Sequence, residues 1–145
     1  MPALTRYDGL SEHLCKKLID LSTDGLSLTL HTSSFTAETT DDVYADLNAE
    51  LPTANGYTAG GQALTGVTVS RTGSATTLSA DAVVWTASGG AITAMYAVLR
   101  DTTANKLLAY GPVQLNEGDG VTPEDMTATD GNTFTVSSAS LLVID

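Results

Sequence analysis

The chain has 145 residues, of which 42% are apolar, so it is long and apolar enough to bury a globular core. Its 17 acidic side chains outnumber 6 basic ones, and the net charge of −11 opposes binding to nucleic acid or to an anionic membrane surface. Two interpretations of the charge stay open, namely simple solubility and self-repulsion in a protein that works at high local copy number.

The N-terminal 25 residues are predicted to form a helical arm. In "DGLSEHLCKKLIDL" (8–21), leucines three and four apart form one apolar stripe, which Asp8 or Ser11 can cap and Gly25 ends. Cys15 is the only cysteine, so no intrachain disulfide is possible, and we expect it to be a small core residue. The segment has no apolar run of signal-peptide or membrane-span length, so we expect the chain to fold in the cytosol.

A strand and a second short helix are expected next. "LSLTLHT" (26–32) alternates strictly, which predicts a half-buried strand with Leu28 and Leu30 on its buried face. In "DDVYADLNAELP" (41–52), apolar residues fall four apart behind two aspartates, and Pro52 ends the pattern.

From Leu64 onward the apolar period is two, which is typical of strands. The phase slips at Gly66, which suggests a β-bulge there. Pro112 places the end of its strand at an edge or a bulge. The expected strands are 63–71, 76–87, 91–100, 106–115 and 132–145, of which 91–100 is central and 132–145 contains one or two strands.

About seven short strands with helices only near the N-terminus favour an antiparallel β-sandwich with a short N-terminal helical segment. We expect a single domain over 1–145, in which the helical arm covers 1–25 and the sandwich covers 26–145. The core is expected to include Trp85, Tyr96 and Val98 besides the two strand leucines.

The glycine cluster in "ANGYTAGGQALTG" (54–66) does not fit a phosphate site. Gln and Ala follow the glycine pair where a P-loop has Lys and Ser or Thr, and a strand pattern follows where a P-loop has a helix. The cluster instead predicts a packed structural loop in which glycines take positive φ and the aromatic ring is the anchor. The residues of this loop are Asn55, Gly56, Tyr57, Gly60 and Gly61.

Nothing in the pattern points to catalysis or to a bound ion. His13 and His31 are the only histidines, and neither has a second ligand at zinc spacing. The nucleophile motif Gly-x-Ser-x-Gly is absent. The acidic stretch 116–125 departs from the calcium-loop pattern, so a solvated loop is favoured. We therefore predict no catalytic residue, no cofactor and no metal.

The order of these segments resembles a widespread group of small virion proteins of tailed bacteriophages. The resemblance runs from Gly9 to Tyr110, and its most specific piece is "NGYTAGG" with "TGVTV" behind it. It further rests on "LSLTLHTSSFT", on "DDVYADLNAEL" and on the long strand "AMYAVLRDTTANKLLAY". No catalytic residues accompany the family.

The resemblance implies a non-enzymatic structural protein, and a head decoration (cement) protein fits best. Its partners would be the major capsid protein and further copies of itself, on the outer capsid surface of a virion made in bacterial cytoplasm. An acidic protein suits that outer face better than the DNA-lined interior. A neck, tail or fibre-base adaptor is the alternative, followed by a receptor- or glycan-binding module. The segments 1–9, 33–42 and 116–132 would reach neighbouring subunits.

Overall fold

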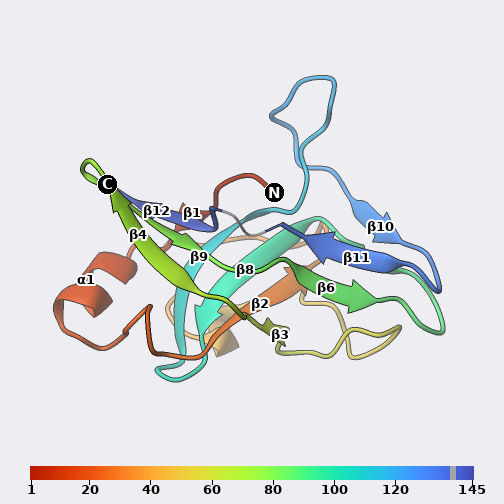
Figure 1. The fold of residues 1–145 in the computed structure, drawn as a ribbon. Helices are drawn as coiled ribbons and strands as arrows, with labels where there is room; N and C mark the ends of the chain where they lie inside the picture. Colours follow the sequence, from red (N-terminus) through yellow and green to blue (C-terminus); the bar gives the residue numbers. More distant parts are fainter. Residues whose placement is uncertain (138–139) are drawn as a thin grey trace.

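The computed structural model describes residues 1–137 and 140–145 (Figure 1). The fold is mainly β with antiparallel sheets and one short N-terminal helix, which confirms the predicted fold class. Its elements are β1 (Thr5–Arg6), α1 (Leu10–Cys15), β2 (Leu26–His31), the 3-10 turn η1 (Tyr44–Asp46), β3 (Gln62–Ala63), β4 (Thr68–Thr72), β5 (Ala75–Ser79), β6 (Val83–Thr86), β7 (Ile92–Ala94), β8 (Tyr96–Asp101), β9 (Lys106–Pro112), β10 (Met126–Ala128), β11 (Thr133–Val136) and β12 (Leu142–Ile144).

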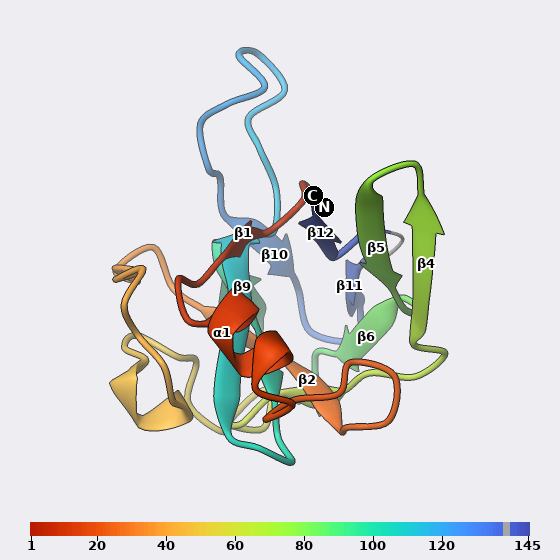
Figure 2. The ribbon, with the colours of Figure 1, turned by 90° about the vertical axis from the view of Figure 1, so that its left-hand side faces the viewer.

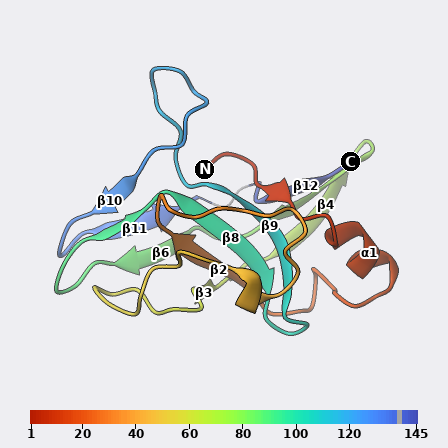
Figure 3. The same ribbon diagram turned by 180° about the vertical axis from the view of Figure 1, so that it is seen from behind.

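A five-stranded antiparallel sheet in the order β1-β9-β8-β2-β3 is the centre of the fold, with β8 in the middle as predicted for the 91–100 segment. Three smaller sheets, β12-β5-β4, β11-β6 and β10-β7, accompany it. Seen from behind, β2, β8 and β9 cross the middle of the molecule, and β6 and β11 run beside them (Figure 3).

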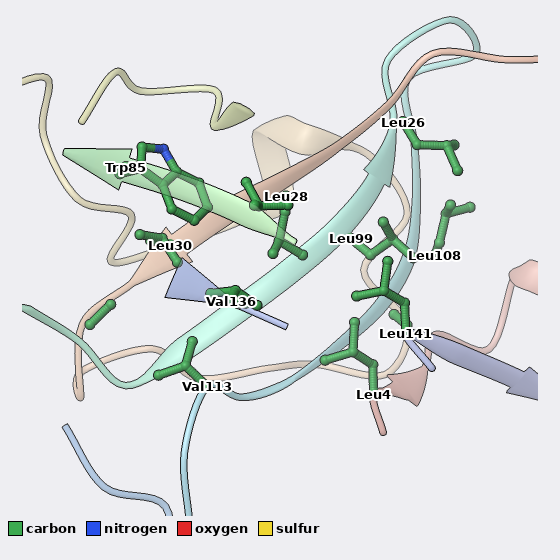
Figure 4. Close-up of a cluster of buried hydrophobic side chains, with 14 of the residues drawn as sticks. Leu4, Leu26, Leu28, Leu30, Trp85, Leu99, Leu108, Val113, Val136 and Leu141 are labelled. Carbon is green, nitrogen blue, oxygen red and sulfur yellow. The ribbon is translucent and has the colours of Figure 1, made fainter. Parts of the chain in front are cut away.

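One face of the large sheet packs against the smaller sheets. Leu28 and Leu30 of β2 are fully buried there, and Trp85 of β6 lies against them (Figure 4). Phe134 of β11 meets the indole ring edge-on, with the two ring centroids 6.1 Å apart. This packing of β-layers is the observation from which we infer a sandwich.

The opposite face of the large sheet is covered by the segment that follows β2. Phe35 lies over this face, with its ring centroid 4.6 Å from that of His31 and 5.6 Å from that of Tyr96. Phe35 and Val98 belong to a second buried cluster on this face. Val98 is fully buried in it, whereas Tyr96 is only half-buried at its margin. Strand β2 is consequently buried on both faces, so the prediction of a half-buried strand was wrong.

A β-bulge lies in β9, not at Gly66. Leu99 pairs with Ala109 and Arg100 pairs with Leu107, so Leu108 is the extra residue. The bulge turns both Leu108 and Ala109 toward the core between the large sheet and the smaller sheets. Gly66 instead lies between β3 and β4 with φ +60.

The N-terminal segment is not a helical arm. α1 ends at Cys15 because Lys17 adopts a left-handed conformation (φ 55), and the amides of Lys17 and Leu18 bond back to the carbonyls of Leu14 and His13. The stripe is broken there, so Leu18 is 50% exposed, and Cys15 is exposed instead of buried.

The residues before α1 are part of the sheet and do not extend outward. β1 pairs with Ala109 and Tyr110 of β9, and the flanking side chains of Leu4 and Tyr7 are buried. Pro112 pairs at the end of β9, beyond the reach of β1, which agrees with its predicted edge position.

Several predicted elements are shorter or divided in the structure. The helix expected over 41–52 is the single turn η1, because the Asp46 carboxylate accepts the amides of Asp42 and Val43 and the chain then becomes extended. The strand expected over 91–100 divides at Met95 into β7 and β8, which pair with β10 and β2. The segment 76–87 likewise divides into β5 and β6, and β10 was not predicted at all.

Candidate functional site

The glycine-rich loop is fastened to the end of β2 by one carboxylate. Glu50 accepts a hydrogen bond from the Tyr57 hydroxyl at 2.7 Å and one from the Gly60 amide at 2.6 Å. Its other oxygen accepts the Tyr44 hydroxyl. Glu50 itself forms an antiparallel bridge with His31 at the end of β2. Glu50 thus joins β2 through its backbone to the turn η1 and the loop, which its carboxylate holds.

Tyr57 is the anchor that the sequence predicted. Its side chain is 2% exposed, and its ring centroid lies 6.1 Å from that of Trp85. Its hydroxyl accepts the Leu30 amide at 3.1 Å and so continues the hydrogen bonding of β2 beyond the end of β3. Burial raises the pKa of Tyr57, and Glu50 raises it further, so the hydroxyl stays protonated.

The glycines of the loop have positive φ, as expected, but their surroundings differ. A Cβ atom on Gly61 would lie 2.1 Å from the Leu28 carbonyl oxygen, and one on Gly56 would lie 2.0 Å from that of Thr86. At Gly60 (φ +97) a Cβ would meet only the Arg100 guanidinium, at 3.5 Å.

Asn55 also takes a left-handed conformation (φ 54). Its side-chain amide donates to the Ala91 carbonyl at 3.0 Å, and its own carbonyl accepts the Ser88 amide at 3.1 Å. These two bonds hold the loop against the turn between β6 and β7.

Arg100 of β8 completes the cluster. Its guanidinium carbon lies 4.1 Å from the centroid of the Tyr44 ring, and it donates to the Gly60 carbonyl at 3.2 Å and to the Ser27 hydroxyl at 3.1 Å. The sequence analysis assigned no role to Glu50 or Arg100, because their hydrogen-bond partners are brought to them only by the folded chain. The polar groups of the cluster hydrogen-bond to one another and hold the loop on the sheet.

Replacing Tyr57 with phenylalanine should lower the free energy of unfolding by about 1–3 kcal/mol, because the buried Leu30 amide loses its acceptor. Tyr44→Phe is the matched control, since it removes a half-buried hydroxyl whose partners, the Glu50 carboxylate and the Gly60 backbone, lie outside β2. It should cost less than about 1 kcal/mol. Urea unfolding of both variants measures the difference. Equal losses would show that the Leu30 hydrogen bond is unimportant.

His31 is a buried structural residue beside this cluster. Its Nδ1 lies 2.8 Å from the Asn48 carbonyl oxygen, which can only accept, so Nδ1 carries a proton. Its Nε2 lies 2.9 Å from the Thr29 hydroxyl oxygen. A neutral ring protonated at Nδ1 can only accept at Nε2, so the hydroxyl proton points to the ring and not to the Val98 carbonyl 3.3 Å away. Burial lowers the pKa of His31, with the Asn48 bond and Glu50 acting in the opposite direction.

The stability that neutral His31 contributes should be fully present above its unfolded pKa of about 6.5 and should be lost as pH falls below that value. The reason is that the unfolded chain binds the proton more readily than the folded one. Titration of the ring protons by NMR gives the folded pKa directly, and His13→Asn leaves His31 as the single histidine for assignment. A folded His31 that titrates at 6.5 or above would contradict the expectation.

A second concave region is acidic. A groove of about 500 Å³ is lined by Asp8, Glu12, Asp41 and Asp42 together with other side chains. Asp42 lies 3.0 Å from His13 Nε2 and also pairs with the Lys106 ammonium group, so one carboxylate contacts both of these side chains.

The predicted solvated loop at 116–125 overlaps a projecting arm, which we define as residues 114–124. The arm stands away from the body between β9 and β10 (Figure 1). The Asp119 carboxylate accepts the amides of Val121 and Thr122, and hydrogen bonds from Thr122 lower the pKa of Asp119 to about 2. Glu124 accepts side-chain amides of Gln114 and Asn116 across the base of the arm. The arm is therefore internally hydrogen-bonded, and Val121 near its tip is 74% exposed.

Among residues 1–137 and 140–145, no group of three or more His, Cys, Asp or Glu side chains is arranged to hold a metal ion. None of the helices in the described part of the chain is long and apolar enough to span a membrane. The chain has no significant match among protein-family models, curated proteins or solved structures.

Proposed function

We propose that the protein is a non-enzymatic structural protein of a tailed-bacteriophage virion and that it binds the outer face of the major capsid lattice as a decoration protein. The proposal rests on the sequence resemblance over Gly9–Tyr110. One structural observation supports it. The most specific part of that resemblance, the loop around Tyr57, uses its polar groups to hold the loop on the sheet, with Glu50 at the centre. Such a loop is suited to a scaffold and leaves these groups unavailable to a substrate.

The net charge supports an outer position on the capsid. The net charge of −11 disfavours contact with packaged DNA. Many copies held by modest contacts can stabilise a shell, because each further contact on the lattice is made at high effective concentration.

The alternative is a neck, tail or fibre-base adaptor. The projecting arm favours it, since an internally hydrogen-bonded projection such as 114–124 also suits insertion between two different ring components. Copy number separates the two functions, because a decoration protein is needed at every lattice position and an adaptor only at one vertex.

The test compares particles with and without the protein. We expect capsids that lack the protein to release DNA at a lower temperature than complete capsids. Added purified protein should restore the release temperature. Val121→Asp protein, added to depleted capsids in the same way, tests the arm alone, because the change lies at an exposed position outside the folded body. If depleted capsids are as robust as complete ones and density is missing only at the tail vertex, decoration is wrong and the adaptor takes its place.

A further inference from the structure

Strand β4 has a free edge at which a second copy of the chain could pair. β4 is an end strand of the sheet β12-β5-β4, and all five of its residues are exposed. It is the longest of the strands at sheet ends in the described part of the chain. Figure 2 shows β4 on the outer side of β5. An edge strand presents unpaired backbone donors and acceptors, which makes it a template for a further strand.

The hairpin defines which backbone groups point outward. Thr72 pairs with Ala75 across a two-residue turn, in which Gly73 has φ +63. The pair that closes such a turn is hydrogen-bonded, and hydrogen-bonded pairs alternate along an antiparallel ladder. The N–H and C=O groups of Val69 and Arg71 therefore point away from β5, toward the free edge.

The sequence of β4 matches itself in one antiparallel register. A two-fold axis at Ser70 places Val69 opposite Arg71 of the second copy, and Thr68 opposite its Thr72. The outward groups of Val69 and Arg71 then form four hydrogen bonds, and no like charges face each other directly. This is also the two-fold register that pairs every residue of β4. Val69, which is 43% exposed, would be covered by the aliphatic stem of Arg71 from the other copy.

We propose that two copies of the chain associate by antiparallel pairing of their β4 strands about Ser70. This proposal deepens the self-association contained in the proposed function, but it depends only on the geometry of the hairpin. Two paired five-residue strands bury less surface than a stable interface requires, so the dimer is weak in free solution and is strengthened where copies are crowded. The contact is isologous and closed, so it yields pairs and not filaments.

Cysteine cross-linking tests the register directly. In a Cys15→Ser background, Ser70→Cys should form a disulfide-linked dimer, because non-hydrogen-bonded pairs bring Cα atoms to about 4.5 Å. Thr68→Cys is the matched control on the same strand. In the proposed register, its two copies lie four residues apart along the pair, about 13 Å, and should not cross-link.

A charge exchange tests the same register without a covalent bond. Val69→Lys places a lysine opposite each Arg71 and should weaken the dimer about tenfold in sedimentation equilibrium. The double variant Val69→Lys/Arg71→Glu makes each facing pair complementary and should restore association. Circular dichroism of these exposed-site variants checks that folding is unchanged.

Equal cross-linking at positions 68 and 70, or a monomer at every concentration, would overturn the pairing. Protein that stabilises capsids while remaining monomeric would refute this inference and leave decoration intact. Protein that pairs through β4 but binds no capsid would refute decoration alone.

Discussion

Gly61→Ala is expected to lower the free energy of unfolding by about 3 kcal/mol or more, because the substitution combines two penalties. The residue has φ +78, a conformation that disfavours any side chain, and its Cβ atom would lie 2.1 Å from the Leu28 carbonyl oxygen. That oxygen belongs to a buried central strand, which has little room to move. Neither the loop nor β2 can relieve the overlap without losing hydrogen bonds to Glu50 or to β8.

Gly60→Ala separates the two penalties. It carries a positive φ (+97) but meets only the flexible Arg100 side chain at 3.5 Å, so we expect a loss of about 1 kcal/mol. Thermal and urea unfolding of both variants measure the contrast. If the two alanines cost the same, the close approach to Leu28 does not limit the loop, and its structural role must be reconsidered.

Leu28→Ala should cost about 2–5 kcal/mol, since the side chain is completely buried between the large sheet and the smaller ones. The surrounding side chains come from several strands, so the cavity cannot be closed by the movement of one element. Val84→Ala, at a strand position that is 41% exposed, is the control and should change stability by less than about 1 kcal/mol. A loss below 1 kcal/mol for Leu28→Ala would contradict the described core.

The sequence identified the strands better than the helices, and the reason is physical. Period-two patterning after Leu64 predicted strands there, and Trp85 was expected in the core. In β6, Val83 and Trp85 are buried and Val84 is exposed. The leucine stripe of 8–21 continues through Lys17, where the backbone leaves the helix, and no local pattern signals that change. The burial of β2 on both faces depends on a segment that folds back over it, carrying Phe35, and strand periodicity contains no information about such a cover.

The candidate site was predicted only in part, because the sequence shows local properties and not the contacts that form when the chain folds. Tyr57 and the glycines could be recognised, because positive φ and an aromatic anchor are local properties. Arg100 could not, because its guanidinium acquires Ser27 only when β8 is placed beside β2. Glu50 could not, because its carboxylate acquires the Tyr57 hydroxyl and the Gly60 amide only when the loop folds back over the segment before it. The bulge at Leu108 was missed because it contains no glycine and interrupts no apolar pattern.

The strand order of the large sheet has a consequence for synthesis on the ribosome. β1 and β2 are made before their main partners, β9 and β8, from which more than 60 residues separate them. β2 and β3 are consecutive in the chain but pair at only two positions across a long connection, whereas β8 and β9 pair along their whole length across a short turn. The β8–β9 hairpin therefore closes the shortest loop and forms at the least entropic cost. The apolar segment "LSLTLH" of β2 therefore remains largely unpaired until that hairpin has formed. Until β8 and β9 have been made, β2 is an apolar segment open to association with other chains.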